Sequence, residues 1–343
     1  MIIFRADGNS VIGAGHIMRC LSIANTAKEN GEVCKFILAT DDFKETIIGN
    51  GHSVEVLNSD YTRVDSKEIL EVISNEKPSA VIVDSYFVTE VDMDALRQHC
   101  NESDSKLVYI DDRCCCAFPC DILINYNVSA NRNSYDKLYE NTANPVLLIG
   151  TEYVPLRKEF QNQEYRGVLR NAENIIVSTG GADSEHFTLS LINEARQFVD
   201  FNFHFVVGMM NRDKAEIRKL ASEHGNIIIH ENVTEMGKLM KSCDVAVSAS
   251  GSTLYELCAT HTPAITYILA DNQIPLANEF DKRGIIKNQG DIRSVGKLKL
   301  AHDLICDAVK LAENYEERER ISKSMATVVD GDGAKRIVEA ILR

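Results

Sequence analysis

Positive charge is scarce in this chain. Its 37 Lys and Arg residues are outnumbered by 51 Asp and Glu, so the formal net charge is −14 and the isoelectric point lies near 5.2. Nucleic acids and anionic membranes attract basic surfaces, and this charge therefore argues against either as the main partner. An anionic small-molecule substrate is compatible with it, because a local site can be positive on an acidic protein.

Long apolar runs are also absent. No stretch approaches the roughly 18 apolar residues of a membrane-spanning helix. The first residues, MIIFRAD, lack the basic region and the apolar core of a signal peptide. The ten cysteines follow no regular spacing. We therefore expect a cytoplasmic protein with reduced thiols rather than a disulfide-stabilised scaffold.

The alternation of apolar and helical segments predicts an α/β protein. With 343 residues, 44% of them hydrophobic, the chain is long enough for about two domains. Several apolar segments carry hydrophobic residues on both faces, as strands of a buried parallel sheet do. The predicted strands are 2–4, 33–39, 53–56, 80–84, 107–110, 122–124 and 146–149, then 174–178, 203–208, 226–230, 244–248 and 264–269. The first helix is expected from Gly15 to Asn30, with Gly31 as its stop.

The strand–helix alternation breaks near residue 150 and then restarts. We predict two Rossmann-type, doubly wound α/β domains, 1–152 and 153–343, facing each other across a cleft. The end of the chain is expected to be helical, with Gly331 and Gly333 preceding a last helix at 334–342. Ligands bind at the carboxyl ends of strands in such sheets, so residues that follow strands are the candidates for a site.

The first strand leads into FRADGNSVIGAGHIMRC, residues 4–20. Gly13 and Gly15 permit a tight turn with close backbone approach. His16 and Arg19 can share one face of the helix that follows, and the N–H groups at its start suit an anion. The competing interpretation is a plain glycine-rich turn with a solvated His and Arg, because two glycines are a weak signal.

A second loop lies in VSASGSTLYELCA, residues 247–259. The N–H and hydroxyl groups of Gly251, Ser252 and Thr253 can hold a phosphate at the helix start. Glu256, one turn later, can accept hydrogen bonds from a ribose. The alternative is an N-capping serine with a surface glutamate.

STGGADSEH, residues 178–186, has the same strand–glycine–helix form. It can also face phosphate or sugar, or His186 can be merely exposed.

Acidic residues follow two strands of the first half. Asp84, with either Asp111 or Asp112, can form a carboxylate pair for acid–base chemistry or a metal site, and all three can equally be helix caps or loop acids. The run CCCAFPC, residues 114–120, invites a zinc interpretation. Three successive thiolates do not readily meet one tetrahedral ion, and the sequence contains no paired C-x-x-C, so we expect no metal.

Taken together, these motifs resemble a known family. R-A-D-G-N-S-V-I-G-A-G-H-I-M-R matches the pattern R-x-D-x-x-x-x-I-G-x-G-H-x-x-R of the UDP-sugar hydrolases of bacterial pseudaminic acid biosynthesis (PseG). VDSYF, IDD, CDILIN, PLRKEF, TGGAD and VSASGSTLYE are similar to further motifs of that family, in its order, over roughly residues 1–290. The wider group is the GT-B glycosyltransferases, which share SASGSTLYE and which the terminal helices resemble more.

The resemblance implies a GT-B fold with C-terminal helices and a reaction. A UDP-linked 2,4-diacetamido-2,4,6-trideoxy sugar, L-altro in the family, is hydrolysed to the free sugar and UDP. Water attacks the anomeric carbon with inversion, without metal or cofactor. His16 is then the general base, a role that suits an imidazole at cytoplasmic pH. The helix start at 251–253 stabilises the charge of the departing UDP.

The resemblance also implies the contacts and partners. The first domain would carry His16 and the sugar site, and the second would bind UDP. The expected substrate contacts are Arg5, Asp7, Gly13, Gly15, Arg19, Tyr86 and Arg157. The expected nucleotide contacts are Gly180, Gly181, Ser250, Gly251, Ser252, Thr253, Glu256, Asn272 and Gln273. The partners are the UDP-sugar and UDP, with no nucleic acid or membrane, and the chain is expected to be a monomer or a weak homo-oligomer.

Two other functions stay open. In a GT-B glycosyltransferase, His16 would deprotonate an acceptor hydroxyl instead of water, and an acceptor site, often an apolar or basic membrane-facing patch, would be needed on the first domain. The sequence shows no such patch. A non-catalytic nucleotide-sugar-binding protein would keep SASGSTLYE but would not need His16.

Overall fold

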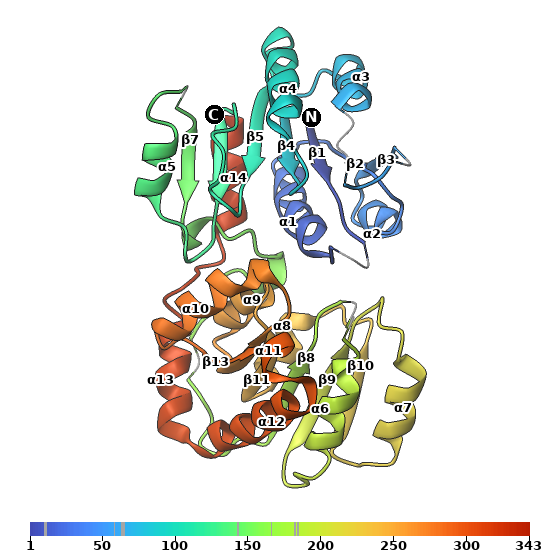
Figure 1. The fold of residues 1–343 in the computed structure, drawn as a ribbon, viewed down its shortest axis with the longest axis vertical. Coiled ribbons are helices and arrows are strands. Elements are labelled where there is room, and N and C mark those ends of the chain that lie inside the picture. Colours follow the sequence, from blue (N-terminus) through green and yellow to red (C-terminus); the bar gives the residue numbers. More distant parts are fainter. Residues whose placement is uncertain are drawn as a thin grey trace. The chain divides into compact units, whose positions relative to one another are not determined.

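The chain folds into two α/β units (Figure 1). The computed structural model describes residues 1–9, 12–57, 59–62, 66–142, 144–165, 167–181, 183 and 185–343. Four motif residues lie outside the described residues: Ser10 and Val11 of the first motif, and Ala182 and Ser184 of STGGADSEH. In the described part of the chain, no helix is both long and apolar enough to cross a membrane.

The N-terminal unit is built on a seven-stranded parallel sheet in the order β3-β2-β1-β4-β5-β6-β7. Its strands are β1 Ile2–Ala6, β2 Cys34–Leu38, β3 Ser53–Val56, β4 Ala80–Asp84, β5 Lys106–Ile110, β6 Ile122–Asn125 and β7 Val146–Ile149. Its helices are α1 Gly15–Glu29, α2 Lys44–Gly49, α3 Ser66–Glu76, α4 Glu90–Glu102, α5 Arg132–Leu138, η1 Thr151–Tyr153 and α14 Gly333–Leu342.

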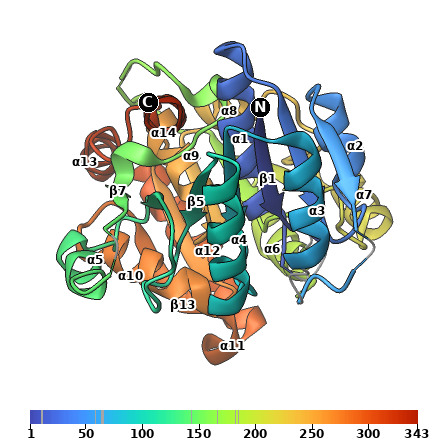
Figure 2. The ribbon, with the colours of Figure 1, turned by 90° about the horizontal axis from the view of Figure 1, so that it is seen from above.

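The centre of this sheet is the core of the unit. All residues of β1 and β4 are buried, as expected for central strands of a parallel sheet. The helices α3 and α4 lie side by side (Figure 2), and their apolar side chains form a core cluster with Ile3, Val81 and Leu107. The strand order reverses between β1 and β4. In open α/β sheets, ligands bind at the carboxyl ends of the strands at such a switch point.

The C-terminal unit repeats this plan with a six-stranded parallel sheet in the order β10-β9-β8-β11-β12-β13. Its strands are β8 Asn174–Ser178, β9 Asn202–Val207, β10 Ile227–Glu231, β11 Val245–Ala249, β12 Ala264–Ile268 and β13 Lys287–Asp291. Its helices are η2 Lys158–Phe160, α6 Phe187–Ala195, α7 Lys214–Ser222, α8 Met236–Ser242, α9 Thr253–Thr260, η3 Asp271–Gln273, α10 Ile274–Lys282, α11 Ile292–Val295, α12 Lys297–Glu313 and α13 Tyr315–Met325. Here the order reverses between β8 and β11, which is the second switch point.

The predicted strands are confirmed, and one strand was missed. The sequence KNQGD of β13 is polar and its side chains are half-buried or exposed, so it has no apolar pattern. It becomes a strand because its backbone pairs with β12, with Ile265 opposite Lys287, and it forms the edge of the sheet. Backbone pairing of this kind does not require apolar side chains, so the hydrophobic pattern of the sequence does not reveal it.

The last helix belongs to the first unit, which differs from the predicted boundaries 1–152 and 153–343. The units are Met1–Arg157 with Asp332–Arg343, and Lys158–Gly331. Helix α14 packs on α1 and η1 (Figure 1, red), and the Nζ of Lys106 donates to the carbonyl of Ile341 at 2.8 Å. Gly333 makes the close approach possible, because a Cβ there would lie 2.2 Å from the carbonyl oxygen of Val154.

Candidate functional site

Hydrogen bonds join Asn9, after β1, to the glycine-containing segment that precedes α1. The side-chain Oδ1 of Asn9 accepts from the N–H of Ile12 at 3.0 Å, and its carbonyl accepts from the N–H of Gly13 at 2.9 Å. Gly13 has φ +80°, a left-handed conformation that glycine adopts without strain. A Cβ on Gly13 or Gly15 would meet no atom of the described residues within 4 Å, so among these residues both glycines border open space beside the start of α1.

His16 is buried at the switch point of the first sheet and bound to the end of β4. Its Nδ1 lies 2.6 Å from Oδ1 of Asp84, a carboxylate with no exposed surface. No described residue is hydrogen-bonded to the other ring nitrogen, Nε2. The neighbouring ring of Tyr86 meets His16 edge-on, with ring centroids 4.5 Å apart. The sequence pattern therefore identified His16 and an acidic residue after a strand as candidates. It did not show that their side chains are hydrogen-bonded.

Arg19 is fully engaged within the protein. Its Nε donates to Oδ2 of Asp84 at 2.6 Å, and its Nη1 donates to Asp112 at 3.0 Å and to the hydroxyl of Tyr126 at 2.9 Å. Its Nη2 donates to Oδ1 of Asp84 and to Oδ2 of Asp112. A guanidinium has five N–H donors, and these five contacts use all of them. Arg19 therefore joins the carboxylates of Asp84 and Asp112, and the substrate contact expected for it stays a prediction.

Asp112 is the second carboxylate of this cluster. Besides Arg19, it accepts from the hydroxyl of Tyr86 at 2.9 Å and from the side-chain amide of Asn127 at 3.0 Å. Of the two candidate partners for Asp84, Asp112 is thus the one that shares its cluster. Asp111 points elsewhere and shapes its own loop, accepting from the N–H groups of residues 113 and 114 and from the hydroxyl of Tyr135.

Charge pairing keeps these carboxylates ionised. Burial alone would raise the pKa of Asp84, but Arg19, and after it His16, lower that pKa well below its usual range. Burial and Arg19 oppose each other in the same way at Asp112, whose pKa is also lowered. Burial opposes the charge of Arg19, yet Asp112 and Asp84 together raise the pKa of its guanidinium. Neither carboxylate is therefore suited to donate a proton as a general acid near neutral pH.

Arg5 and Asp7 lie beneath the first loop. Both are buried, with Nη1 of Arg5 2.6 Å from Oδ2 of Asp7, and Oδ1 of Asp7 accepts from the N–H of Ala39 at 2.9 Å. This pair joins the ends of β1 and β2, and it is not brought into contact with His16. Arg157 ends the first segment of the unit and is half-buried. The substrate contacts expected for these three residues stay predictions.

In the C-terminal unit, the predicted nucleotide residues follow β8, β11 and β12. Gly180 and Gly181 follow β8, and the segment from Ser250 to Glu256 follows β11. Asn272 and Gln273 lie in η3, after β12. Gln273 reaches over the β11 loop, because a Cβ on Gly251 would lie 3.8 Å from its Nε2. The fold thus brings separate motifs to the carboxyl ends of the strands of the second sheet.

The helices α6 and α9 both begin at this end of the sheet, and among the described residues one of the two starts has uncapped N–H groups. At α6, Asp183 accepts from the N–H groups of Phe187 and Thr188 at 2.9 and 3.0 Å, so the start is capped. At α9 there is no side-chain cap, and the N–H groups of Ser252 and Thr253 have no acceptor among the described residues. A helix start with uncapped N–H groups attracts an anion.

Next to the α9 start, Ser250 is fully buried and its hydroxyl has no partner among the described atoms. The sequence suggested that STGGADSEH, like SASGSTLYE, can face phosphate or sugar. The structure favours the second, because Asp183 already occupies the N–H groups of the first.

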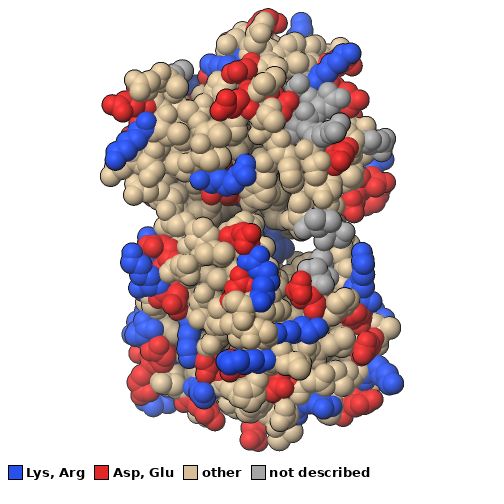
Figure 3. Space-filling model, viewed as in Figure 1, with Lys and Arg blue, Asp and Glu red and all other residues tan. Residues whose placement is uncertain are grey.

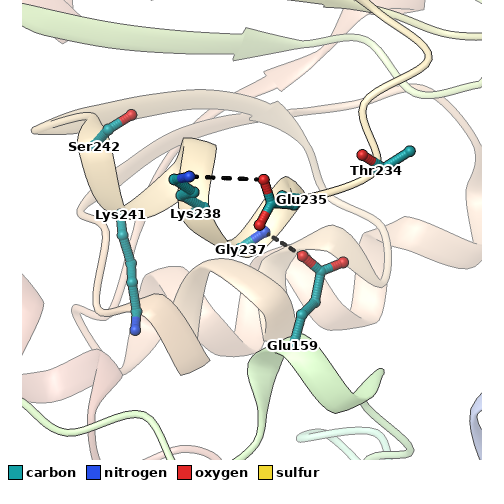
Figure 4. A pocket seen from close by; sticks show the side chains of 7 residues that line it. All are labelled: Glu159, Thr234, Glu235, Gly237, Lys238, Lys241 and Ser242. Carbon is teal, nitrogen blue, oxygen red and sulfur yellow. Dashed lines mark hydrogen bonds and ion pairs between the residues drawn. The ribbon is translucent and has the colours of Figure 1, made fainter.

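A separate pocket lies beside α8 (Figure 4). Its Glu159 accepts from the N–H of Gly237 at 2.8 Å, and Lys238 pairs with Glu235 at 3.7 Å. Its lining residues are Glu159, Thr234, Glu235, Gly237, Lys238, Lys241 and Ser242. None of these is a predicted site residue.

On the face that Figure 3 shows, Lys and Arg side chains are interspersed with Asp and Glu. All ten cysteines are free thiols, with Cys115 exposed within the CCCAFPC run. Among the side chains that the structure describes, no three His, Cys, Asp or Glu residues form a group that could hold a metal ion.

The fold is of the GT-B type. The solved structure of MurG from Acinetobacter baumannii aligns with a TM-score of 0.65 at 12% identity, covering 99% of this chain and 98% of that protein. UDP-GlcNAc 2-epimerase from Neisseria meningitidis, solved with UDP-GlcNAc bound, aligns with a TM-score of 0.60 at 13% identity over the whole of both chains. At such identities, these likenesses establish the architecture alone.

Relatives found by sequence confirm the predicted resemblance. The chain is 25% identical to the UDP-2,4-diacetamido-2,4,6-trideoxy-beta-L-altropyranose hydrolase of Campylobacter jejuni, over 82% of this chain and 97% of that protein. It is 23% identical to the spore coat polysaccharide biosynthesis protein SpsG of Bacillus subtilis, over 98% and 96%. It is 28% identical to the uncharacterized protein MJ1062 of Methanocaldococcus jannaschii, over 78% of this chain but only 55% of that protein. No family model matches the chain.

Proposed function

We propose that this chain hydrolyses a UDP-linked 2,4-diacetamido-2,4,6-trideoxy sugar to the free sugar and UDP, as a step of pseudaminic acid biosynthesis. The Campylobacter hydrolase, matched over nearly its whole length, supports the substrate class. The structural observation that carries the proposal is His16. It is an imidazole at a sheet switch point, held at Nδ1 by Asp84 and bordered by the open space at Gly13 and Gly15.

In the proposed reaction, His16 is the general base. Its Nε2 takes a proton from a water molecule, and the oxygen of that water attacks the anomeric carbon from the face opposite to UDP, which inverts the configuration. A positioned general base typically contributes about 100- to 10,000-fold to the rate. Because Asp84 and Asp112 are held ionised, they supply no proton to a leaving group. This suits a leaving group such as UDP, which departs as an anion without being protonated.

The open start of α9 is the proposed seat of the diphosphate. The N–H groups of Ser252 and Thr253 would donate to phosphate oxygens, with the amide of Gln273 near Gly251. Glu256 follows Ser252 by four residues, about one helical turn. In the proposed complex, its carboxylate accepts from the ribose hydroxyls.

The direct test is incubation with the UDP-linked diacetamido sugar and no acceptor, with the product anomer followed by NMR. We expect UDP and free sugar of inverted configuration. His16→Asn should lower kcat by about 100- to 10,000-fold with little change in substrate affinity. The matched control is His302→Asn, an exposed histidine on α12 paired with Glu194. Near-normal turnover in a folded His16→Asn protein would remove His16 from the chemistry.

The second candidate function is glycosyl transfer, with which the architecture shared with solved glycosyltransferases is compatible. In that case, the same incubation would release UDP only after an acceptor is added. A third outcome, binding of the UDP-sugar with no release under either condition, would indicate a nucleotide-sugar-binding protein.

A further inference from the structure

The contact between His16 and Asp84 fixes where the imidazole proton lies. Arg19 keeps the Asp84 carboxylate ionised, so both of its oxygens only accept hydrogen bonds. A ring nitrogen 2.6 Å from such an oxygen must carry a proton. In the neutral imidazole, Nδ1 is therefore the protonated nitrogen, and the lone pair is on Nε2.

Nη2 of Arg19 also lies 3.0 Å from Nδ1 of His16, which suggests a second interpretation in which Nδ1 accepts from Arg19. This interpretation fails on geometry. Nη2 already has acceptors on Asp84 and Asp112, and a bare Nδ1 would face the Asp84 oxygen lone pair against lone pair. The short distance between Arg19 and His16 results from the Asp84 oxygen that they share.

We propose that Asp84 is a positioning residue for the hydrolysis, with Arg19 as the group that holds it ionised. The inference rests on the proposed function for its chemistry. A water proton moves to Nε2, the water oxygen bonds to the anomeric carbon, and the bond from that carbon to the phosphate oxygen breaks with its electron pair leaving on UDP. Asp84 fixes the tautomer before this step and stabilises the imidazolium after it. The imidazolium then loses its proton to solvent.

The structure explains why Asp84→Asn is an informative change. An amide has one accepting and one donating end, whereas both oxygens of Asp84 face donors. Oδ2 faces Nε of Arg19 and the Cys20 thiol, and Oδ1 faces His16 and Nη2 of Arg19. The guanidinium Nε–H cannot change its role, but the imidazole can move its proton. The asparagine oxygen is therefore expected to face Nε of Arg19 and its NH₂ to face His16, while Nη2 of Arg19 keeps its acceptor on Asp112. This arrangement forces the imidazole proton onto Nε2 and removes the base.

Nitrogen NMR of protein labelled at histidine reads the tautomer directly. With nine histidines, the His16 signals are assigned by their loss in His16→Asn. At neutral pH, we expect Nδ1–H in the unaltered protein and Nε2–H in Asp84→Asn. Kinetics should show kcat reduced by roughly 100- to 10,000-fold with KM nearly unchanged. The matched control is Asp112→Asn, which removes the other carboxylate of Arg19 without touching His16 and should leave the tautomer as Nδ1–H.

The results of these experiments can overturn the inference in two ways. An Nε2–H tautomer in the unaltered protein overturns the inference, even if Asp84→Asn does not fold. An unchanged tautomer together with near-normal kcat in a folded Asp84→Asn protein also overturns it. Failure of the unaltered protein to hydrolyse any UDP-sugar would instead refute the proposed function, because the NMR result on the free protein does not depend on substrate.

Discussion

Replacing Arg19 by methionine tests the electrostatic basis of the site. The guanidinium is the shared counter-charge of two buried carboxylates, whose side chains are 0% (Asp84) and 13% (Asp112) exposed. Removing one partner of a buried ion pair costs about 3–5 kcal/mol, because the remaining charge is left uncompensated. For a unit of this size, 1 kcal/mol corresponds to about 2–4 °C in melting temperature, so we expect Tm to fall by roughly 6–20 °C.

The loss of stability in Arg19→Met should be larger at neutral pH than at acidic pH. The pKa values of Asp84 and Asp112 are lowered in the folded protein, so their stabilising contribution is fully present above their unfolded values, about 4, and is lost as pH falls through the folded values. Without Arg19, burial is no longer opposed and both pKa values rise. The stability difference between the unaltered protein and Arg19→Met should therefore be largest near neutrality and should shrink as pH falls from the raised pKa values of the variant to the lowered pKa values of the unaltered protein.

Urea unfolding followed by circular dichroism, with calorimetry alongside, measures both effects. Arg132→Met, which removes an exposed arginine from the same unit, is the control and should change stability by less than about 0.5 kcal/mol. Adding Asp112→Asn to Arg19→Met removes one uncompensated charge, so the double variant should recover at least about 1 kcal/mol. The reasoning fails if Arg19→Met is within 1 kcal/mol of the unaltered protein, or if its deficit is the same at pH 7 and pH 4.

Three further changes test the nucleotide site, the role of the carboxylates and the last helix. Glu256→Ala should weaken UDP binding about 10- to 150-fold in calorimetry while kcat stays within a few-fold, since the ribose is remote from the bond that breaks; unchanged UDP affinity would refute the proposed nucleotide site. Turnover should survive excess EDTA, because Arg19 occupies the carboxylates of Asp84 and Asp112 that could otherwise bind a cation; a loss restored by Mg²⁺ or Mn²⁺ would contradict this. Gly333→Ala should destabilise the protein by about 1–3 kcal/mol in urea titration, since its Cβ would lie 2.2 Å from a backbone oxygen; Gly225→Ala, whose Cβ meets nothing, is the control.

The sequence by itself predicted the elements and the loops of interest. Apolar patterns predicted the strands of both sheets except β13, because such patterns report which residues are buried over short distances along the chain. The glycines beside His16 and the SASGSTLYE segment were identified for the same local reason, since turns and helix starts are encoded in neighbouring residues. The rule that ligands bind at the carboxyl ends of strands then directed attention to the residues that follow strands.

Only the tertiary structure showed which side chains of the site are hydrogen-bonded to one another. Arg19 meets Asp84 and Asp112 across 65 and 93 residues of sequence, and no local pattern shows that the end of β4 delivers its carboxylate to His16. The structure also assigned α14 to the first unit, and it separated the α6 start, capped by Asp183, from the open α9 start. Each of these depends on which side chains are brought within hydrogen-bonding distance. Such contacts are set by how the sheets and helices pack, and periodicity along the chain carries no information about them.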